Sequence, residues 1–373
     1  ERAQVPFNPA SVVKVGTTWF ALERLGPEHR YVTRFGFTGS WDRATGTITG
    51  DLVVGGGGDP DFQPENAFLV ARELDRLGVR RVSGNLVIDG PFWLGWEGGP
   101  FRRAADPAER ARRAGRRLLR ALNPFHWGIA QREAWEKLCT RRGWPVRPEP
   151  SVVVAGTVRV ADVEHVRPLL VHRSNPLAVI LKRFDVYSNN DIERIADGLG
   201  GAPAVEAFLR SKVGPGVRLE TACGLGTNRM TAVQVVHMLE GLARWLAGHG
   251  LALRDILPVP GCDPGPIPRM FPALATGDLA RAVAVKSGTL SDTDGGVAVL
   301  AGAFTDTSGA EVFFCVAAPR AGGRLHQLRG LEQDWLTGLI GRRGGARVFE
   351  CGARLLFSDT GAGLVEVEKG GKR

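Results

Sequence analysis

Apolar residues recur every three or four positions between Val12 and Leu25, which is the spacing of one buried helix face. Pro9 stands where the first helical turn would begin, and Gly26-Pro27 follows the run as a stop signal. We therefore predict a helix that begins near Pro9 and ends at Leu25. The same spacing predicts helices at 65–77, 175–187, 191–199, 231–247 and 325–339.

Short runs rich in β-branched and aromatic residues, bounded by glycine-rich turns, predict strands. These runs lie at 31–37, 47–54, 81–88, 151–160, 282–286, 296–304 and 311–317. Helices cluster ahead of the last three strands, which favours an α+β or mixed architecture over a regular alternation of strands and helices. The longest apolar run, Val297–Phe304, is far shorter than the ~18 residues of a membrane span and reads as a buried strand.

The length of 373 residues changes this picture, because a typical domain has ~150 residues. We expect two domains, or one domain with a large insertion. The composition, 43% hydrophobic and 23% charged, is that of an ordinary globular protein. The 50 glycines and 23 prolines show no three-residue period and indicate a turn-rich mixed fold.

The chain carries 48 basic and 39 acidic residues, a net charge of +9, and only 7 of the basic residues are lysines. Positive charge favours acidic partners such as nucleic acid, anionic lipid or an anionic cell-wall polymer. Eight arginines lie between Arg102 and Arg120, where Asp106-Pro107 predicts a helix start on a surface excursion. This segment lacks interleaved aromatic residues, so we expect no nucleic-acid partner and a loose electrostatic contact with an anionic envelope surface.

The five cysteines form no Cys-x-x-Cys pair and no Cys/His ligand spacing, which excludes zinc ribbons and thioredoxin-like sites. No histidines pair at metal-ligand spacing either, and we expect no metal and no cofactor. An oxidising compartment would allow a bridge between Cys223 and Cys262. Cys315 lies in an apolar run and is expected to pack as a small hydrophobic residue.

Three short patterns contain candidate chemistry. Ser11 and Lys14 stand three residues apart on the first predicted helix, so that an unprotonated Lys14 could take the proton of the Ser11 hydroxyl. Ser188 and Asn190 lie where one predicted helix ends and another begins. Each pattern alone is expected by chance at roughly 0.2 matches, and ordinary helix capping or a solvated face is the simpler interpretation of each.

The third pattern, Lys286-Ser287-Gly288-Thr289, ends an apolar run that reads as a strand. Gly288 removes a side chain at a place where another backbone would approach closely. The alternative is a hydrophilic strand end that enters a turn. The three patterns together, in this order, are expected by chance in only roughly a few sequences in a thousand.

This set resembles the Ser-x-x-Lys, Ser-x-Asn and Lys-Thr/Ser-Gly motifs of the penicillin-recognising serine acyl-transferases, which include penicillin-binding proteins and serine β-lactamases. The 177 residues from Ser11 to Ser188 exceed the separation in a compact β-lactamase. The segments that resemble D-alanyl-D-alanine carboxypeptidases of the penicillin-binding protein 4 type are 9–11, 25–27, 50–60, 82–89 and 186–190. In that family a domain is inserted after the helix of the nucleophile.

The resemblance implies an α+β fold, with a β-lactamase/transpeptidase-like domain of helices packed on an antiparallel sheet and a large inserted mixed α/β domain. We place the catalytic domain at 1–32 plus 169–343 and the inserted domain at 33–168. Residues 344–373 form a C-terminal extension without a resemblance to the family.

The same resemblance implies the role of each site residue. Ser11 would be the nucleophile and Lys14 its base, while Ser188 would relay a proton to the leaving amine. Asn190 would hold the peptide amide and contact Lys14. Lys286 would supply positive potential, Ser287 would bind the terminal carboxylate beside Gly288, and the N–H groups of Ser11 and Thr289 would form the oxyanion hole.

The implied activity is that of a penicillin-sensitive serine D-alanyl-D-alanine carboxypeptidase, with endopeptidase activity on cross-links as an extension. Its partners would be peptidoglycan stem peptides, with β-lactam antibiotics as covalent inhibitors. The alternatives are a catalytically impaired wall-binding homologue and a serine β-lactamase-related hydrolase. The chain begins with Glu1 rather than methionine, and we expect a periplasmic or otherwise extracytoplasmic protein whose signal peptide is not part of this sequence.

The sequence departs from the family pattern in four places. Only ten residues precede Ser11, where the family has strands of its catalytic sheet. The arginine-rich segment stands in place of a third, smaller domain, and Thr221–Leu225 stands where the family has Asp-Gly-Ser-Gly-Leu. In the tail, Arg347–Glu350 and Ala353–Phe357 are candidates to fill vacated edge strands.

Overall fold

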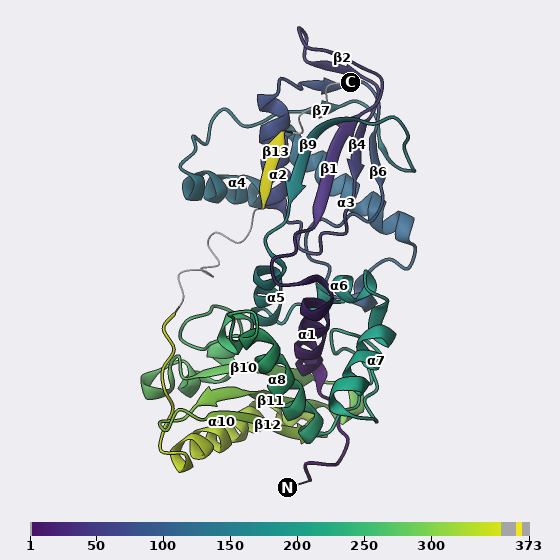
Figure 1. Cartoon of the computed structure of the whole chain (residues 1–373). Coiled ribbons are helices and arrows are strands. Elements are labelled where there is room, and N and C mark those ends of the chain that lie inside the picture. The colour runs from purple at the N-terminus through teal and green to yellow at the C-terminus, as the bar shows by residue number, and fades with distance from the viewer. Residues whose placement is uncertain (1, 352–362, 368–373) are drawn as a thin grey trace. The chain divides into compact units, whose positions relative to one another are not determined.

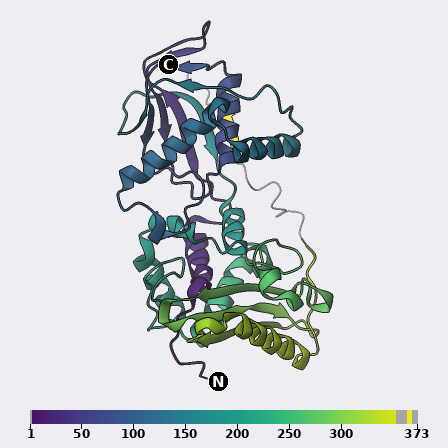
Figure 2. The ribbon, with the colours of Figure 1, turned by 180° about the vertical axis from the view of Figure 1, so that it is seen from behind.

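The structure is a computed structural model, and it describes residues 2–351 and 363–367. The chain divides into two compact units, each of which is described by itself (Figures 1 and 2). The first unit comprises Glu1–Glu28, Gly98–Phe101 and Leu177–Leu356. The second comprises His29–Glu97, Arg102–Pro176 and Phe357–Arg373.

The helices of the first unit come from both sides of the inserted sequence. A short 3-10 turn, Ala10–Val12, leads into α1 (Val13–Leu25), and Gly26 ends this helix with a φ of 82°, which glycine adopts without strain. The later helices are α5 (Leu177–Val186), α6 (Glu193–Asp197), α7 (Gly201–Val213), α8 (Ala232–Ala247), α9 (Ile267–Met270) and α10 (Leu325–Arg342).

The sheet of the first unit is antiparallel in the order β10-β11-β12, formed by Val283–Leu290, Val297–Thr305 and Glu311–Pro319. Every residue from Val297 to Phe304 is buried, so both faces of the central strand are covered. On one face, α10 contributes Leu336 and Ile340 to a core that also contains Leu300 and Phe304 of β11. α8 packs against β11 and β12, and the turn before α1 packs against β10 (Figure 1).

The second unit contains two sheets. The larger is mixed, in the order β13-β9-β1-β4-β6-β8, and the smaller has the order β2-β3-β5-β7. The strands are β1 (Val32–Phe37), β2 (Ser40–Asp42), β3 (Thr47–Thr49), β4 (Leu52–Gly55), β5 (Arg81–Val82), β6 (Leu86–Asp89), β7 (Val153–Val154), β8 (Val158–Val160), β9 (Arg167–Arg173) and β13 (Leu364–Val367). Helices α2 (Pro64–Arg76), α3 (Pro107–Leu122) and α4 (Ile129–Arg142) share one core with these strands.

The boundaries of the units differ from the expected limits at residues 33 and 168. The second unit begins at His29 and returns at Pro176, because β1 pairs with β9 and the pair belongs to one sheet. Gly98–Phe101, from within the expected insertion, belongs to the first unit. These limits depend on which strands pair, and a single sequence does not show pairing.

Several expected elements need correction. The run at 47–54 is broken into β3 and β4 at Gly50, which has a φ of 148° and where a Cβ would lie 2.1 Å from the carbonyl oxygen of Thr38. The run at 81–88 is likewise divided into β5 and β6. Helices α4 and α7 and strand β9 were not predicted. α4 is strongly charged, and α7 begins at Gly201 directly after Gly200.

The arginine-rich segment is not a pure surface excursion. Asp106 caps α3 by accepting hydrogen bonds from the N–H groups of Ala108 and Glu109, as the sequence predicted. The opposite side of α3 is buried, with Ala111, Ala114, Leu118 and Leu122 in the core of the second unit. Small and apolar residues between the arginines therefore decide where this helix lies.

The C-terminal segment does not follow the expected edge-strand pairing. Arg347–Glu350 forms no strand, although the N–H groups of Arg347 and Phe349 donate to the carbonyls of Thr305 at 2.8 Å and Arg281 at 2.6 Å. Ala353–Phe357 lies outside the described residues. Further on, β13 pairs with β9 at the edge of the larger sheet of the second unit.

The disulfide links Cys262 to Cys351, so the bridge considered between Cys223 and Cys262 is wrong. Cys223 is a buried free thiol, and burial raises its pKa to about 11. Cys351 lies 89 residues after Cys262, and only the folded chain brings the two together. Among the described helices, none is both long enough and apolar enough to cross a membrane.

Candidate active site

The first and second sequence motifs meet at the amine of Lys14. This side chain is fully buried at the start of α1, and its Nζ donates to the Oγ of Ser11 at 2.8 Å. Nζ also donates to the Oδ1 of Asn190 at 2.8 Å and to the carbonyl of Cys223 at 2.6 Å. Residues 176 positions apart in the sequence thus share one amine.

These three contacts suit a lysine that gains and loses a proton. A carbonyl oxygen and the Oδ1 of an amide only accept hydrogen bonds, whereas a serine hydroxyl either accepts or donates. A neutral Lys14 therefore still donates to Asn190 and Cys223, and its lone pair faces the hydroxyl of Ser11. Burial lowers the pKa of Lys14, although the negative charges of Asp185 and Glu193 oppose this shift.

The remaining motif residues form a second hydrogen-bonded group. The Nζ of Lys286 on β10 donates to the Oγ of Ser188 at 2.9 Å and to the carbonyl of Ser287 at 2.9 Å. Lys286 is buried, and this burial, together with the charge of Lys14, lowers its pKa to about 7. Ser188 has a φ of 50°, an uncommon conformation for a residue other than glycine.

The backbone of β10 lies close to the nucleophile. A Cβ atom on Gly288 would lie 2.6 Å from the carbonyl oxygen of Pro9, so only glycine allows this approach. The N–H of Val285 donates to the carbonyl of Pro258, away from β11. Because backbone directions repeat every second residue in a strand, the N–H of Thr289 points to the same edge of the strand.

The stretch Thr221–Leu225 supports the base although it differs from the family pattern. The carboxylate of Glu193 accepts the N–H groups of Ala222 at 3.0 Å and Cys223 at 2.7 Å, which holds the carbonyl of Cys223 toward Lys14. Gly224 has a φ of 87°, and a Cβ there would lie 2.0 Å from the carbonyl oxygen of Ala10. The stretch therefore contributes backbone rather than side-chain chemistry.

Two residues near the motifs were missed by the sequence interpretation. Asp185 is wholly buried on α5, three residues before Ser188, and no periodicity marks it as different from a helix surface residue. The Nη2 of Arg329 on α10 donates to the Oγ1 of Thr289 at 3.1 Å. Nothing in a single sequence pairs α10 with β10. In the described part of the chain, no three His, Cys, Asp or Glu side chains gather as metal ligands would.

A known protein family matches most of this chain. The model of the D-Ala-D-Ala carboxypeptidase 3 (S13) family matches residues 1–107 and 150–324. The unmatched interval between them covers nearly all of α3 and α4. The arginine-rich helix is thus outside the part of the chain that the family describes.

Three solved structures resemble the chain over most of its length. The predatory endopeptidase Bd0816 from Bdellovibrio bacteriovorus, in complex with the immunity protein Bd3460, has a TM-score of 0.77 and 24% identity over 93% of this chain and 90% of its own. Penicillin G-acylated Bd3459 from the same organism, in complex with the same immunity protein, has a TM-score of 0.72 and 22% identity, covering 92% and 88%. Penicillin-binding protein 4 from Haemophilus influenzae, complexed with a β-lactam, has a TM-score of 0.65 and 19% identity, covering 91% and 92%. At these identities the likeness concerns the fold.

Proposed function

The chain belongs to the D-Ala-D-Ala carboxypeptidase 3 (S13) family, and from this premise we propose that it is a serine D-alanyl-D-alanine carboxypeptidase that acts on peptidoglycan stem peptides. The observation that carries the proposal is the shared amine of Lys14, which lies 2.8 Å from both the Ser11 hydroxyl and the Asn190 amide oxygen. A serine hydroxyl is a weak nucleophile without such a base.

In the proposed acylation step, the Oγ of Ser11 attacks the carbonyl carbon between two D-alanine residues, and its proton passes to the neutral Nζ of Lys14. The backbone N–H groups of Ser11 and Thr289 would stabilise the oxyanion, each donor contributing about 3 kcal/mol to lowering the barrier. The C–N bond then breaks, and Ser188 transfers a proton to the leaving amine while Lys286 replenishes it. The products are the acyl-enzyme and free D-alanine.

Deacylation would use the same residues, with water in place of the amine. Before this step, the proton that Lys14 took from Ser11 passes to Lys286, which leaves Lys14 neutral and Lys286 charged again. A water molecule then replaces the amine and gives a proton to Lys14 as it attacks the ester carbon. The C–Oγ bond breaks and the proton returns to Ser11, which restores the free enzyme. Asn190 holds the peptide amide during both steps, and Ser287 with Thr289 would bind the terminal carboxylate beside the positive charge of Lys286.

The family name and the relatives support a peptidoglycan substrate and penicillin as a covalent inhibitor. Because the two Bdellovibrio relatives are named endopeptidases, we extend the proposal to the cleavage of cross-links. An extracytoplasmic location is supported by the Cys262–Cys351 disulfide, since such bonds persist in oxidising compartments.

The proposal is tested by labelling with a fluorescent penicillin. Wild-type protein should form a covalent adduct and Ser11→Ala should form none, because the variant lacks the attacking oxygen. Ser40→Ala, at an exposed position on β2 of the second unit, is the matched control and should label like the wild type. An unlabelled wild type, or equal labelling of Ser11→Ala, contradicts the proposal.

Product analysis separates the competing activities. A carboxypeptidase releases D-alanine from a stem pentapeptide, and an endopeptidase converts a cross-linked dimer to monomers. A wall-binding homologue without turnover would be labelled yet release neither product. A β-lactamase-related hydrolase would lose the penicillin label within seconds, whereas we expect an adduct that persists for minutes.

A further inference from the structure

Three of the lysines that the structure describes are buried: Lys14, Lys182 and Lys286 are 0%, 2% and 1% exposed. A buried ammonium group requires a compensating negative charge, since burial removes the stabilisation that water provides. Asp185 on α5 is also wholly buried, and the positive charges of all three lysines act on its carboxyl group. The Asp185 carboxylate is therefore a candidate counter-ion for each of the three lysines.

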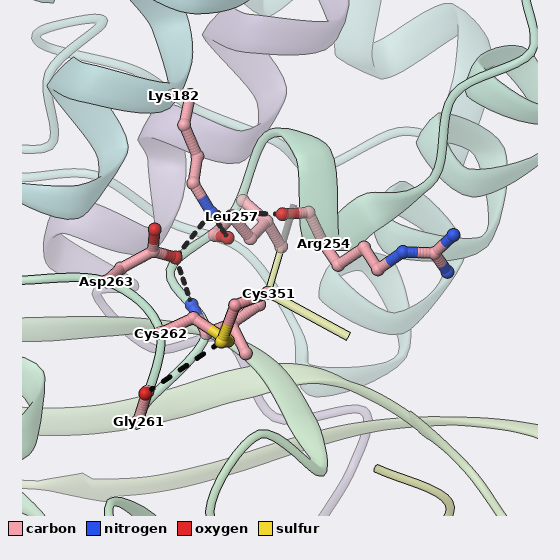
Figure 3. Close-up of a disulfide and its surroundings, with 8 residues drawn as sticks. Lys182, Arg254, Leu257, Gly261, Cys262, Asp263 and Cys351 are labelled. Atoms are coloured by element: carbon pink, nitrogen blue, oxygen red, sulfur yellow. Dashed lines mark hydrogen bonds and ion pairs between the residues drawn. A yellow bond between two sulfur atoms is a disulfide. The ribbon is translucent and has the colours of Figure 1, made fainter. Parts of the chain in front are cut away.

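Lys182 has a counter-ion of its own (Figure 3). Its Nζ donates to the Oδ2 of Asp263 at 2.5 Å and to the carbonyls of Leu257 at 2.6 Å and Arg254 at 3.0 Å. Three acceptors saturate the three N–H bonds of an ammonium group. Asp185 therefore acts on Lys182 only as a secondary counter-ion behind Asp263, whereas it is the acidic group that acts on Lys286.

The side chain and the backbone of Asp185 each contact an element that carries one of the first two motifs. Its Oδ2 accepts a hydrogen bond from the Oγ1 of Thr18 at 2.9 Å, and Thr18 lies one helical turn after Lys14 on α1. Its backbone carbonyl accepts the N–H of Ser188 at 3.2 Å. Within the described parts of the chain, no group donates a hydrogen bond to Oδ1, so this oxygen compensates charge through space.

We propose that Asp185 is a positioning residue for the acylation step, whose carboxylate is the shared counter-ion of Lys14 and Lys286 and holds one proton on that pair of amines. This inference rests on the proposed function. Two buried amines beside one buried carboxylate reach electrical neutrality when one amine is protonated and the other is neutral. That is the state the reaction requires, with Lys14 neutral as the base and Lys286 charged beside Ser188.

The groups around the pair are consistent with this assignment. The positive charges of Lys286 on β10, Lys14 on α1 and Lys182 on α5 oppose the effect of burial, which raises the pKa of Asp185 to about 6. The carboxylate is thus ionised at neutral pH. Glu193 on α6 also acts on Lys14, but both of its oxygens accept backbone N–H groups.

The test is the pH profile of the acylation rate constant with a fluorescent penicillin. In the wild type, activity falls at low pH as Lys14 becomes protonated and at high pH as Lys286 loses its proton. Asp185→Asn removes the anion from both amines, which lowers the pKa of each, so both limbs should move to lower pH by about one unit. Asp185→Glu keeps the charge and should leave both limbs in place.

The matched control is Asp306→Asn, another buried carboxylate of the first unit. β11 pairs Ala301 with Lys286, and Asp306 lies five residues further, roughly 16 Å along the strand direction. This variant should lose stability without moving either limb. If Asp185→Asn does not fold, Asp185→Ser removes the same charge and should produce the same shift.

The inference is contradicted if a folded variant without the Asp185 carboxylate keeps both limbs of its pH profile in place. A purely structural role would lower the acylation rate constant at every pH without displacing the limbs. An equal displacement in Asp185→Glu also contradicts it, since that variant retains the carboxylate. A wild type that is not acylated at any pH overturns the proposed function itself, so the two failures are distinguishable.

Discussion

Individual lysine side chains supply most of the proton-transfer groups of the candidate site. The chain has 41 arginines and 7 lysines, yet among the described residues three lysines are buried and only one arginine, Arg194. Arginine stays charged under all ordinary conditions, whereas a lysine amine can be neutralised by burial. A buried site that must gain and lose a proton therefore requires lysine.

At the residue scale, the depressed pKa of Lys286 predicts a pH-dependent stability. The folded protein releases this proton near pH 7 and the unfolded chain near 10.5, so the unfolded state binds more protons between these values. The free energy of unfolding of the wild type, relative to Lys286→Met, should rise by about 1 to 3 kcal/mol from pH 7 to pH 10. Denaturant unfolding of both proteins at several pH values measures this.

Lys137→Met is the control, because the side chain of Lys137 is 74% exposed on α4. Its difference from the wild type should not change with pH beyond a few tenths of a kcal/mol. A constant difference for Lys286→Met as well would contradict the burial argument.

Among the elements, β10 has the most specific requirements. Its outer edge must approach the turn that carries Ser11, and it must present backbone N–H groups there. Gly288 allows this approach, because any side chain would collide with the backbone of Pro9. The strand thus has no side chain at Gly288 and carries the buried amine of Lys286 two residues earlier.

At this scale we predict that Gly288→Ala lowers the penicillin acylation rate by on the order of 100-fold, because displacing a reacting group by about 1 Å has effects of this size. Rapid-mixing kinetics with a chromogenic penicillin analogue measures the rate. Gly330→Ala on α10, where a Cβ has nothing within 4 Å, should leave the rate unchanged and stabilise the helix by about 0.5 to 1 kcal/mol. Wild-type kinetics in Gly288→Ala would show that β10 does not need to lie so close to Ser11.

For the whole molecule, covalent linkage adds to noncovalent packing. The Cys262–Cys351 disulfide closes a loop of 89 residues that contains the complete sheet of the first unit and α10. Cys262 adjoins Asp263, the partner of Lys182 (Figure 3). The bridge therefore ties the segment after α10 to a buried ion pair on α5.

We predict that replacing both Cys262 and Cys351 by serine lowers the free energy of unfolding of the first unit by roughly 2 to 4 kcal/mol, because the unfolded chain regains loop entropy. Guanidinium unfolding followed by tryptophan fluorescence measures this. Reductant should lower the wild-type midpoint and leave the double variant unchanged. A wild type that is insensitive to reductant under unfolding conditions would contradict the assignment.

The sequence by itself determined the first helix, most of the later helices, the three strands of the last sheet and the three motifs. These features are local: apolar periodicity, caps and residue spacing report on neighbours along the chain. The resemblance to the S13 family rested on the same short segments, and the family match bears it out. The individual roles of Ser11, Lys14, Ser188, Asn190 and Lys286 stay predictions.

Only the tertiary structure decided which distant residues meet. It paired Cys262 with Cys351 instead of Cys223, placed β13 beside β9, and brought Asp185 to the lysines of two motifs. Such contacts depend on strand pairing, burial and chain closure, for which a single sequence contains no periodic signal. The local pattern thus specifies the functional groups, and the fold creates the low-dielectric environment that shifts their protonation.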